Sequence, residues 1–287
     1  MTEWFAQILV CPQCHAKLAL PVDLCCGACG TKFESSRDLR GAWKGSTQMD
    51  LRRWGGPDSS FGLADIEVAP PKLDYAGPKA VRDSSELISE IARLLPNGGD
   101  ALDLGCGPRD QAEPLSYAKF RYVGIDYSGE DADLLADAHA LPFADDSFDL
   151  VFSYAVLEHL WNPLLALREI KRVLRPGGWY VGTVSQGEPF HASYFHMTPW
   201  GLLANLAIVG GFRPDRIWPT EDTLRSLATM GRYPRVLRYV LAAIDTVHRR
   251  LPILAPRKQR WPQREKLLDR LFRAGSVGFA IQKTKVQ

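Results

Sequence analysis

The chain has 287 residues, of which 46% are apolar and 24% charged, and its formal net charge is +2. These values describe a globular protein with one good core and room for a small accessory unit, and they exclude disordered and collagen-like classes. No apolar run reaches the roughly 18–20 residues that a membrane span needs. The N-terminus has no basic start followed by an apolar core, as a signal peptide would, so we expect a cytoplasmic protein.

Cysteines gather near the N-terminus, where five of the six lie between Cys11 and Cys29. Cys11-Pro-Gln-Cys14 and Cys26-Gly-Ala-Cys29 are two CxxC pairs separated by eleven residues. Four thiolates at this spacing can surround one Zn²⁺ tetrahedrally, and such a closed site is structural because it keeps no open position. The alternative is a disulfide pair or free thiols, and a reducing compartment disfavours a disulfide. Cys25 is left over.

The segment 35–72 shows little periodicity and contains Gly55-Gly-Pro57 and Pro70-Pro71, so we expect local turns there. A helix is predicted over Asp83–Leu95, because Asp83 can cap it and its apolar residues form one stripe before Pro96. These features divide the chain into a zinc-binding unit (1–45), a linker (46–82) and a main domain (83–287).

The stretch 101–126, ALDLGCGPRDQAEPLSYAKFRYVGID, organises the main domain. It predicts a buried strand, a glycine turn at Gly105-Cys106-Gly107, a short helix and a second strand that ends at Asp126. Glycines in such a turn let a ligand approach the backbone closely. A carboxylate about twenty residues later can accept hydrogen bonds from ribose hydroxyls. The arrangement predicts a ligand that contains a nucleoside.

Six motifs occur in order along the chain: Asp103-Leu-Gly-Cys-Gly107, Val123-Gly-Ile-Asp126, Ala136–Phe143, Asp145–Asp149, Leu157-Glu-His-Leu160 and Leu174-Arg-Pro-Gly-Gly178. Together they resemble the class I S-adenosylmethionine (SAM) dependent methyltransferases of the type 11 group, over roughly residues 100–184. The resemblance implies an α/β fold with a Rossmann-like, doubly wound, seven-stranded methyltransferase sheet. One residue departs from the family, since Arg109 stands where a small residue is usual.

The resemblance also implies which residues bind SAM. Asp126 accepts from the ribose, Asp137 from the adenine amino group, the Ala138 amide donates to a ring nitrogen, and Leu141 covers the ring. The full implied set is Asp103, Gly105, Cys106, Gly107, Asp126, Tyr127, Asp137, Ala138, Leu141 and Ser153. From its residue type alone, Asp137 is also suited to cap the turn into Leu141-Pro142. In the resembling family the segment before the first helix often folds over the cofactor, and the alternative for 46–82 is a surface connection.

The acceptor side is predicted at the ends of two strands, 149–154 and 179–184. The loop 185–199, called the acceptor loop below, follows the second strand and contains His191 and His196 beside three aromatic residues. Aromatic faces can flank an apolar or sugar-like acceptor, and a histidine can take a proton from a hydroxyl or amine. His159 is a third candidate. The alternative is a loop held to the core by its aromatics, with the loop histidines bonding to backbone and His159 stabilising a helix.

The C-terminal third predicts a helix over 199–208, a strand over 212–218, a helical insert over 222–275 and a last strand over 277–283. Within the insert, the predicted helix Arg235–Leu251 has one apolar face. Residues 225–273 hold thirteen Lys and Arg against three acidic residues, a net charge of +10, which leaves −8 for the rest of the chain. Such a segment can follow phosphates or an anionic membrane, be a solvated face, or pair with the acidic main domain.

Three functions are open at this point. The first is methyl transfer from SAM to an O or N atom of a small-molecule, lipid or glycan acceptor, which the acceptor loop favours. The second is methylation of rRNA or tRNA, with the N-terminal unit and the insert binding the RNA. Residues 8–34 resemble the zinc ribbon of tRNA-methyltransferase activators, but 11–34 hold few basic residues and no Asn/Asp-Pro-Pro-Phe/Tyr motif follows 149–154. The third is a scaffold without activity, which the intact SAM motifs disfavour.

Overall fold

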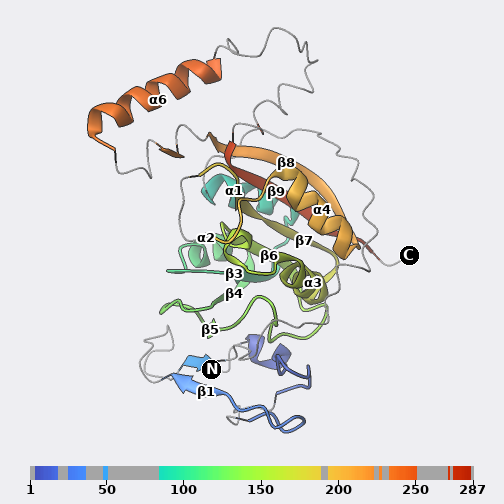
Figure 1. Ribbon diagram of the computed structural model, residues 1–287. Helices are drawn as coiled ribbons and strands as arrows, with labels where there is room; N and C mark the ends of the chain where they lie inside the picture. The colour runs from blue at the N-terminus through green and yellow to red at the C-terminus, as the bar shows by residue number, and fades with distance from the viewer. Residues whose placement is uncertain are drawn as a thin grey trace.

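The computed structural model describes residues 4–18, 25–36, 48–50, 84–188, 193–222, 226–227, 233–250, 271 and 274–285. Its centre is a nine-stranded sheet with the order β1-β2-β5-β4-β3-β6-β7-β9-β8 (Figure 1). The strands are β1 (Glu34–Ser36), β2 (Gln48–Asp50), β3 (Gly99–Leu104), β4 (Phe120–Asp126), β5 (Leu134–Leu135), β6 (Phe148–Tyr154), β7 (Leu174–Ser185), β8 (Phe212–Asp222) and β9 (Ala274–Lys283). The helices are α1 (Ser84–Leu94), α2 (Ala112–Tyr117), α3 (Pro163–Val173), α4 (Pro199–Val209) and α6 (Arg235–Arg250).

Strand β3 lies at the point of the sheet where the order of the strands reverses. It pairs in parallel with β4 on one side and with β6 on the other, so the chain order reverses between β3 and β6. Ligands of such sheets bind beyond the carboxyl ends of the strands at this reversal. β9 runs antiparallel to both β7 and β8, which makes β8 parallel to β7. The seven strands from β5 to β8 confirm the predicted doubly wound sheet.

Two short N-terminal strands extend the sheet beyond the predicted seven. β1 pairs antiparallel with β2, and β2 meets β5 through Asp50 and Leu135. The sequence predicted only turns here, because each strand has three residues and cannot display a period of two. Most of the predicted linker 46–82 lies outside the described residues, as do residues 251–270 of the predicted helical insert.

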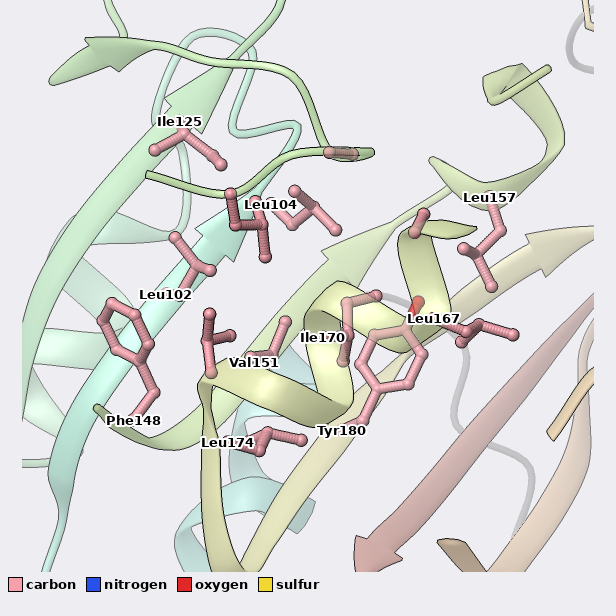
Figure 2. Packing of buried hydrophobic residues seen from close by; sticks show 14 of the residues in the cluster. Leu102, Leu104, Ile125, Phe148, Val151, Leu157, Leu167, Ile170, Leu174 and Tyr180 are labelled. Carbon is pink, nitrogen blue, oxygen red and sulfur yellow. The ribbon is translucent and has the colours of Figure 1, made fainter. Parts of the chain in front are cut away.

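Both faces of the sheet are covered, and each cover has its own core. Leu102, Val151 and Tyr180 belong to the core beneath α3 and α4, together with residues of α3 such as Leu167 and Ile170 (Figure 2). A second core joins α1 and α2 to the opposite face of the sheet. Successive strand residues therefore enter different cores, which explains the continuous apolar runs of β3, β6 and β7.

Helix ends follow signals in the sequence. Asn162 caps α3 by accepting the Leu165 amide at 3.2 Å, and Pro163 takes the first helical position. Thr198 caps α4 by accepting the Gly201 amide at 3.1 Å. The predicted helix of the insert is present as α6, which begins at the predicted residue, Arg235, and Leu251 lies outside the described residues. In the described parts of the chain, every helix falls short of the length and apolarity that crossing a bilayer requires.

Candidate functional site

The glycine turn follows β3 directly, at the carboxyl edge of the sheet. The amides of Gly105 and Cys106 donate to the Ile125 carbonyl at 2.8 and 3.0 Å and so tie the turn to β4. Gly105 (φ +72°) is packed so closely that a Cβ atom would lie 2.6 Å from the Val156 side chain. Gly107 (φ +49°) faces open space instead. The turn is fixed on one side and accessible to a ligand on the other.

Asp126 ends β4 beside this turn, and its carboxylate accepts three backbone N–H groups. The Gly107 amide donates to Oδ2 at 3.0 Å, and the amides of Ser128 and Gly129 donate to Oδ1 at 3.0 and 3.1 Å. These bonds fix the carboxylate, which has about four acceptor positions in all. Capacity for a further donor, such as a ribose hydroxyl, remains. Tyr127 is exposed next to it.

Arg109, the residue that departs from the family pattern, is anchored to its surroundings. Its guanidinium pairs with Asp133 at 2.6 Å and lies over the Tyr122 ring, 5.2 Å from the ring centroid. Asp133 itself is fixed, because it also accepts the Gly124 amide at 2.8 Å. Arg109 has φ +60°, a conformation more usual for glycine. The family's small residue is thus replaced by a side chain that an ion pair holds to the segment after β4.

Asp103 is a buried carboxyl group on β3, two residues before Gly105. The Tyr122 hydroxyl donates to its Oδ2 at 2.8 Å. Burial is the main cause that raises the pKa of Asp103 to about 7, the Asp126 charge adds to the rise, and the Tyr122 hydrogen bond opposes it. This carboxyl group therefore titrates near neutral pH. Sequence reasoning missed Tyr122, because a tyrosine within a strand is ordinary core composition.

Asp137 is held by a histidine that sequence reasoning also missed. Its Oδ1 accepts the His139 backbone amide at 2.9 Å and lies 2.6 Å from His139 Nδ1. The Asn162 amide donates to His139 Nε2 at 3.3 Å, so Nδ1 carries the proton and donates to the aspartate. The imidazole also stacks on Trp161, with ring centroids 4.7 Å apart. His139 thus orients the Asp137 carboxylate, and the Asp-x-His spacing is its signal in the sequence.

The segment 137–143, called the adenine turn below, is fixed from one side by α3. Glu169 accepts the Leu141 amide at 2.8 Å, and Arg172 donates to the carbonyls of Leu141 and Phe143 at 2.9 and 2.7 Å. Leu141, expected to cover the adenine ring, is fully buried in the core. Its side chain therefore supports the turn from inside and presents no surface to a ring. Ala138 is buried too, which leaves its backbone as the group suited to a ligand.

Ser153 also differs from its expected position. Its side chain is fully buried, and its hydroxyl lies 2.9 Å from the Tyr180 hydroxyl. Side chains alternate along a strand, so the next residue, Tyr154, is the one exposed at the carboxyl end of β6. Cys106 is buried as well, and burial raises the pKa of its thiol. Cys106 therefore contributes to the glycine turn through its backbone. The Ser153 side chain is part of the packed core.

Two of the candidate histidines, His159 and His196, lie at the carboxyl edge of the sheet, after β6 and β7. His159 is exposed in the short 3₁₀ helix η3 (Leu157–His159). His196 is exposed in the acceptor loop, and its Nδ1 lies 3.1 Å from the Gln186 carbonyl. Because a carbonyl only accepts, Nδ1 is the donor and Nε2 is the nitrogen that can take a proton. His191 lies outside the described residues.

Glu158 joins η3 to the acceptor loop. Its buried carboxylate accepts the Ser185 amide at 2.9 Å, and its carbonyl accepts the amides of Tyr194 and Phe195 at 2.8 and 3.1 Å. Both aromatic side chains remain exposed. Backbone hydrogen bonds, not these aromatic rings, therefore hold this part of the loop. Ala155, between β6 and η3, has φ +56°, a strained conformation of the kind that gathers at functional sites.

The four predicted metal ligands come together at the N-terminus. The Sγ atoms of Cys11, Cys14, Cys26 and Cys29 all lie within 4.8 Å of one another. Two of these pairs, Cys11 with Cys29 and Cys14 with Cys26, are 3.7 Å apart. Tetrahedral sulfur ligands about 2.3 Å from a zinc ion would be about 3.8 Å apart, so the cluster fits Zn²⁺. Cys25 lies outside this set.

The cysteine cluster lies next to the adenine turn. Val10, which precedes the first cysteine, donates its amide to the Pro142 carbonyl at 3.0 Å. The Ala144 amide donates to the Ile8 carbonyl at 2.8 Å. Figure 1 shows the N-terminal segment against the β5 side of the sheet. Sequence reasoning missed this contact because it joins segments far apart in the chain that share no pattern.

Comparisons with known proteins agree with this geometry. A family model described as "Methyltransferase domain" matches residues 102–182. The chain is 38% identical to demethylmenaquinone methyltransferase of Renibacterium salmoninarum, over 67% of this chain and 92% of that relative. It is 39% identical to an uncharacterized 37.1 kDa protein in transposon TN4556 of Streptomyces fradiae, over 68% of this chain and 66% of that protein.

Other matches are more distant. A ubiquinone biosynthesis O-methyltransferase of Cereibacter sphaeroides is 26% identical, over 55% of this chain and 68% of that enzyme. The chain spans 46–66% of the length of three of the curated relatives it matches. The crystal structure of 1,6-didemethyltoxoflavin-N1-methyltransferase from Burkholderia thailandensis aligns with a TM-score of 0.45 and 14% identity, over 69% of this chain and 77% of that one. The family model and the long match to the Renibacterium enzyme show that this chain belongs to the class I SAM-dependent methyltransferases.

Proposed function

We propose that this protein transfers a methyl group from SAM to an O or N atom of a small-molecule, lipid or glycan acceptor. The observation that carries the proposal is the pairing of an open Gly107 with the fixed Asp126 carboxylate, at the carboxyl edge where the strand order reverses. This is the combination that holds the ribose of a nucleoside ligand in an open α/β sheet. Family membership identifies the nucleoside as SAM.

On the cofactor side, the protein's own groups bind and orient. SAM supplies a methyl group activated by a sulfonium. Asp126 is suited to the ribose hydroxyls, Asp137 to the adenine amino group and the Ala138 amide to a ring nitrogen. His139 and the contacts from α3 preset the adenine turn before binding. These contacts are the same in the ground state and the transition state, so they set SAM affinity more than the rate of transfer.

On the acceptor side, three exposed aromatic side chains and the names of two relatives favour an apolar molecule that contains a ring. Tyr154, Tyr194 and Phe195 are exposed at the carboxyl ends of β6 and β7 and in the acceptor loop. Aromatic faces of this kind stack on ring-shaped acceptors. One relative is named demethylmenaquinone methyltransferase, and another is named ubiquinone biosynthesis O-methyltransferase. A quinone precursor is therefore the first acceptor to test, and positioning it in line with the methyl group supplies most of the catalysis.

A proton must leave when the acceptor is a hydroxyl or a protonated amine. His196 is suited to this task because its Nδ1 is used by the Gln186 carbonyl and its Nε2 is the accepting nitrogen. His159 and His191 are the other candidates for contact with the acceptor. We assign them no proton transfer, since the sequence pattern supports only their place near the acceptor.

We further propose that the four cysteines hold one structural Zn²⁺ within a zinc-binding unit over 1–45, that 46–82 links it to the methyltransferase domain over 83–287, and that the protein works in the cytoplasm. The sulfur spacing supports the metal. A closed four-thiolate site has no position for a reacting water, so its part is to stabilise. The unit supports the adenine turn through the Val10 to Pro142 hydrogen bond. Cysteines without disulfide partners fit a reducing compartment.

The test is transfer of labelled methyl from SAM by the purified full chain into a lysate separated into organic extract, glycan, RNA and protein fractions. We expect label in the organic extract. Asp126→Ala should lose transfer and SAM binding, whereas Asp131→Ala, which removes an exposed carboxylate from the same loop, should keep both. Label only in RNA would overturn the acceptor class, and failure of the wild type to bind SAM would leave a scaffold.

A further inference from the structure

Helix α6 carries a row of apolar side chains that are exposed. Val236, Val240, Ile244 and Val247 recur every three or four residues, which places them along one side of the helix. With Leu237, these side chains are 41–75% exposed. Figure 1 shows α6 apart from the sheet and from the helices that cover it. We call this row of five residues the α6 stripe.

The other side of α6 is polar and basic. Arg235 and Arg238 are exposed, and at about 100° per residue they lie on the side opposite the middle of the α6 stripe. Two tyrosines, Tyr233 and Tyr239, are exposed near the start of the helix. The segment 225–273 as a whole has a net charge of +10. An amphipathic helix with a basic polar face and aromatic flanks is typical of helices that lie in a membrane surface.

The geometry points to a docking site for an anionic membrane, with the α6 stripe inserted at the level of the lipid headgroups. Charge complementarity decides between possible occupants. A second copy of the chain would bring another segment of +10 against the first, and like charges repel. A nucleic acid would pair its phosphates with the arginines but would leave the apolar α6 stripe exposed to water. An anionic bilayer satisfies both, because it covers the apolar row and neutralises the basic face.

The place of the insert in the sheet connects docking with chemistry. β8 is parallel to β7, so its last residue, Asp222, lies at the same sheet edge as the carboxyl end of β7, and β9 begins at that edge with Ala274. Gln186 of the acceptor loop donates its side-chain amide to the carbonyls of Leu271 and Ala274 at 2.6 and 3.1 Å. The Gln186 carbonyl in turn binds His196. These hydrogen bonds join the end of the insert to the acceptor loop.

A membrane-bound α6 would hold this edge of the sheet close to the bilayer. An acceptor dissolved in the lipid, such as a quinone precursor, would then reach the acceptor loop without crossing water. This second part of the inference rests on the proposed function, whereas docking of α6 does not. The two parts can therefore fail separately.

Co-sedimentation of the full chain with vesicles tests the docking. One set of vesicles is phosphatidylcholine with phosphatidylglycerol, and the other is phosphatidylcholine alone. We expect binding to the anionic set only. Val240→Asp places a charge in the α6 stripe and should weaken binding about fifty-fold, since it adds repulsion and removes apolar contact. Ala242→Asp adds the same charge on the basic side of the helix and should cost about fivefold.

Three results would overturn the proposal: wild type that ignores anionic vesicles, equal binding to both sets, or equal losses in the two variants. Sedimentation without vesicles adds a further arm, because a dimer that Val240→Asp dissolves would show that a second copy covers the stripe. Circular dichroism and a SAM titration show whether each variant is folded. Methyl transfer to an acceptor held in detergent tests the proposed function independently of the vesicle-binding result.

Discussion

Replacing Asp103 by asparagine should remove a pH-dependent loss of stability. The buried carboxyl group has a pKa of about 7, raised from 3.8. Between these values the unfolded state binds fewer protons than the folded state, so the free energy of unfolding of the wild type falls as pH rises through this window. The two pKa values give a loss of about 2.5 kcal/mol between roughly pH 5 and pH 8.5. Asparagine has no proton to lose and keeps an oxygen for the Tyr122 hydroxyl.

Urea denaturation at both pH values measures this difference. Asp103→Asn should lack the 2.5 kcal/mol component and should be more stable than the wild type at the higher pH, by up to about 4 kcal/mol. Asp131→Asn, which changes an exposed carboxylate, should follow the wild type at both pH values. If wild type and Asp103→Asn change equally between the two pH values, Asp103 is not the buried acid described here, and its carboxylate is stabilised as an anion.

The other predictions concern the metal, the adenine turn and the glycine turn. Cys14→Ser should lose bound zinc, measured by elemental analysis, and melt at a lower temperature, whereas Cys25→Ser should keep one zinc per chain. His139→Ala should weaken SAM binding about tenfold by calorimetry, because the Asp137 carboxylate loses its orienting donor, and His139→Asn should restore part of it. Gly105→Ala should destabilise the protein by at least about 2 kcal/mol in urea, since the added methyl would lie 2.6 Å from a valine side chain. An unchanged value in any of these three measurements would contradict the contact behind it.

Much of the fold followed from local signals. The predicted helices over 83–95 and 199–208 and the predicted strands over 149–154 and 179–184 are present as α1, α4, β6 and β7, with ends that the structure moves by a few residues. β5 has two residues and β2 has three, so neither could show a pattern. They exist because the neighbouring strand offers unpaired backbone groups, which is a property of the folded sheet and not of their own sequence.

The positions of site residues were predictable where a residue acts through its backbone. They were less predictable where a side chain contacts residues far away in the sequence. The glycine turn and Asp126 lie where the motif order placed them. Leu141 and Ser153 were expected at the ligand because the resemblance implied contacts there. Alternation along β6 turns Ser153 into the core, and Leu141 is buried in the turn that α3 holds. Arg109 illustrates the remaining difficulty, since its partner Asp133 is visible only after β3 and β4 are paired.

The hydrogen bond from Val10 to Pro142 would couple the binding of the proposed zinc ion to the binding of SAM. If zinc stiffens the adenine turn and so strengthens SAM binding, reciprocity requires SAM to strengthen zinc binding by the same factor. We therefore expect a chromogenic chelator to remove less zinc at equilibrium from the SAM-loaded protein than from the empty one. When SAM is scarce, this site would then bind zinc more weakly. Its zinc occupancy would therefore report the supply of methyl donor, although the site takes no part in the methyl transfer.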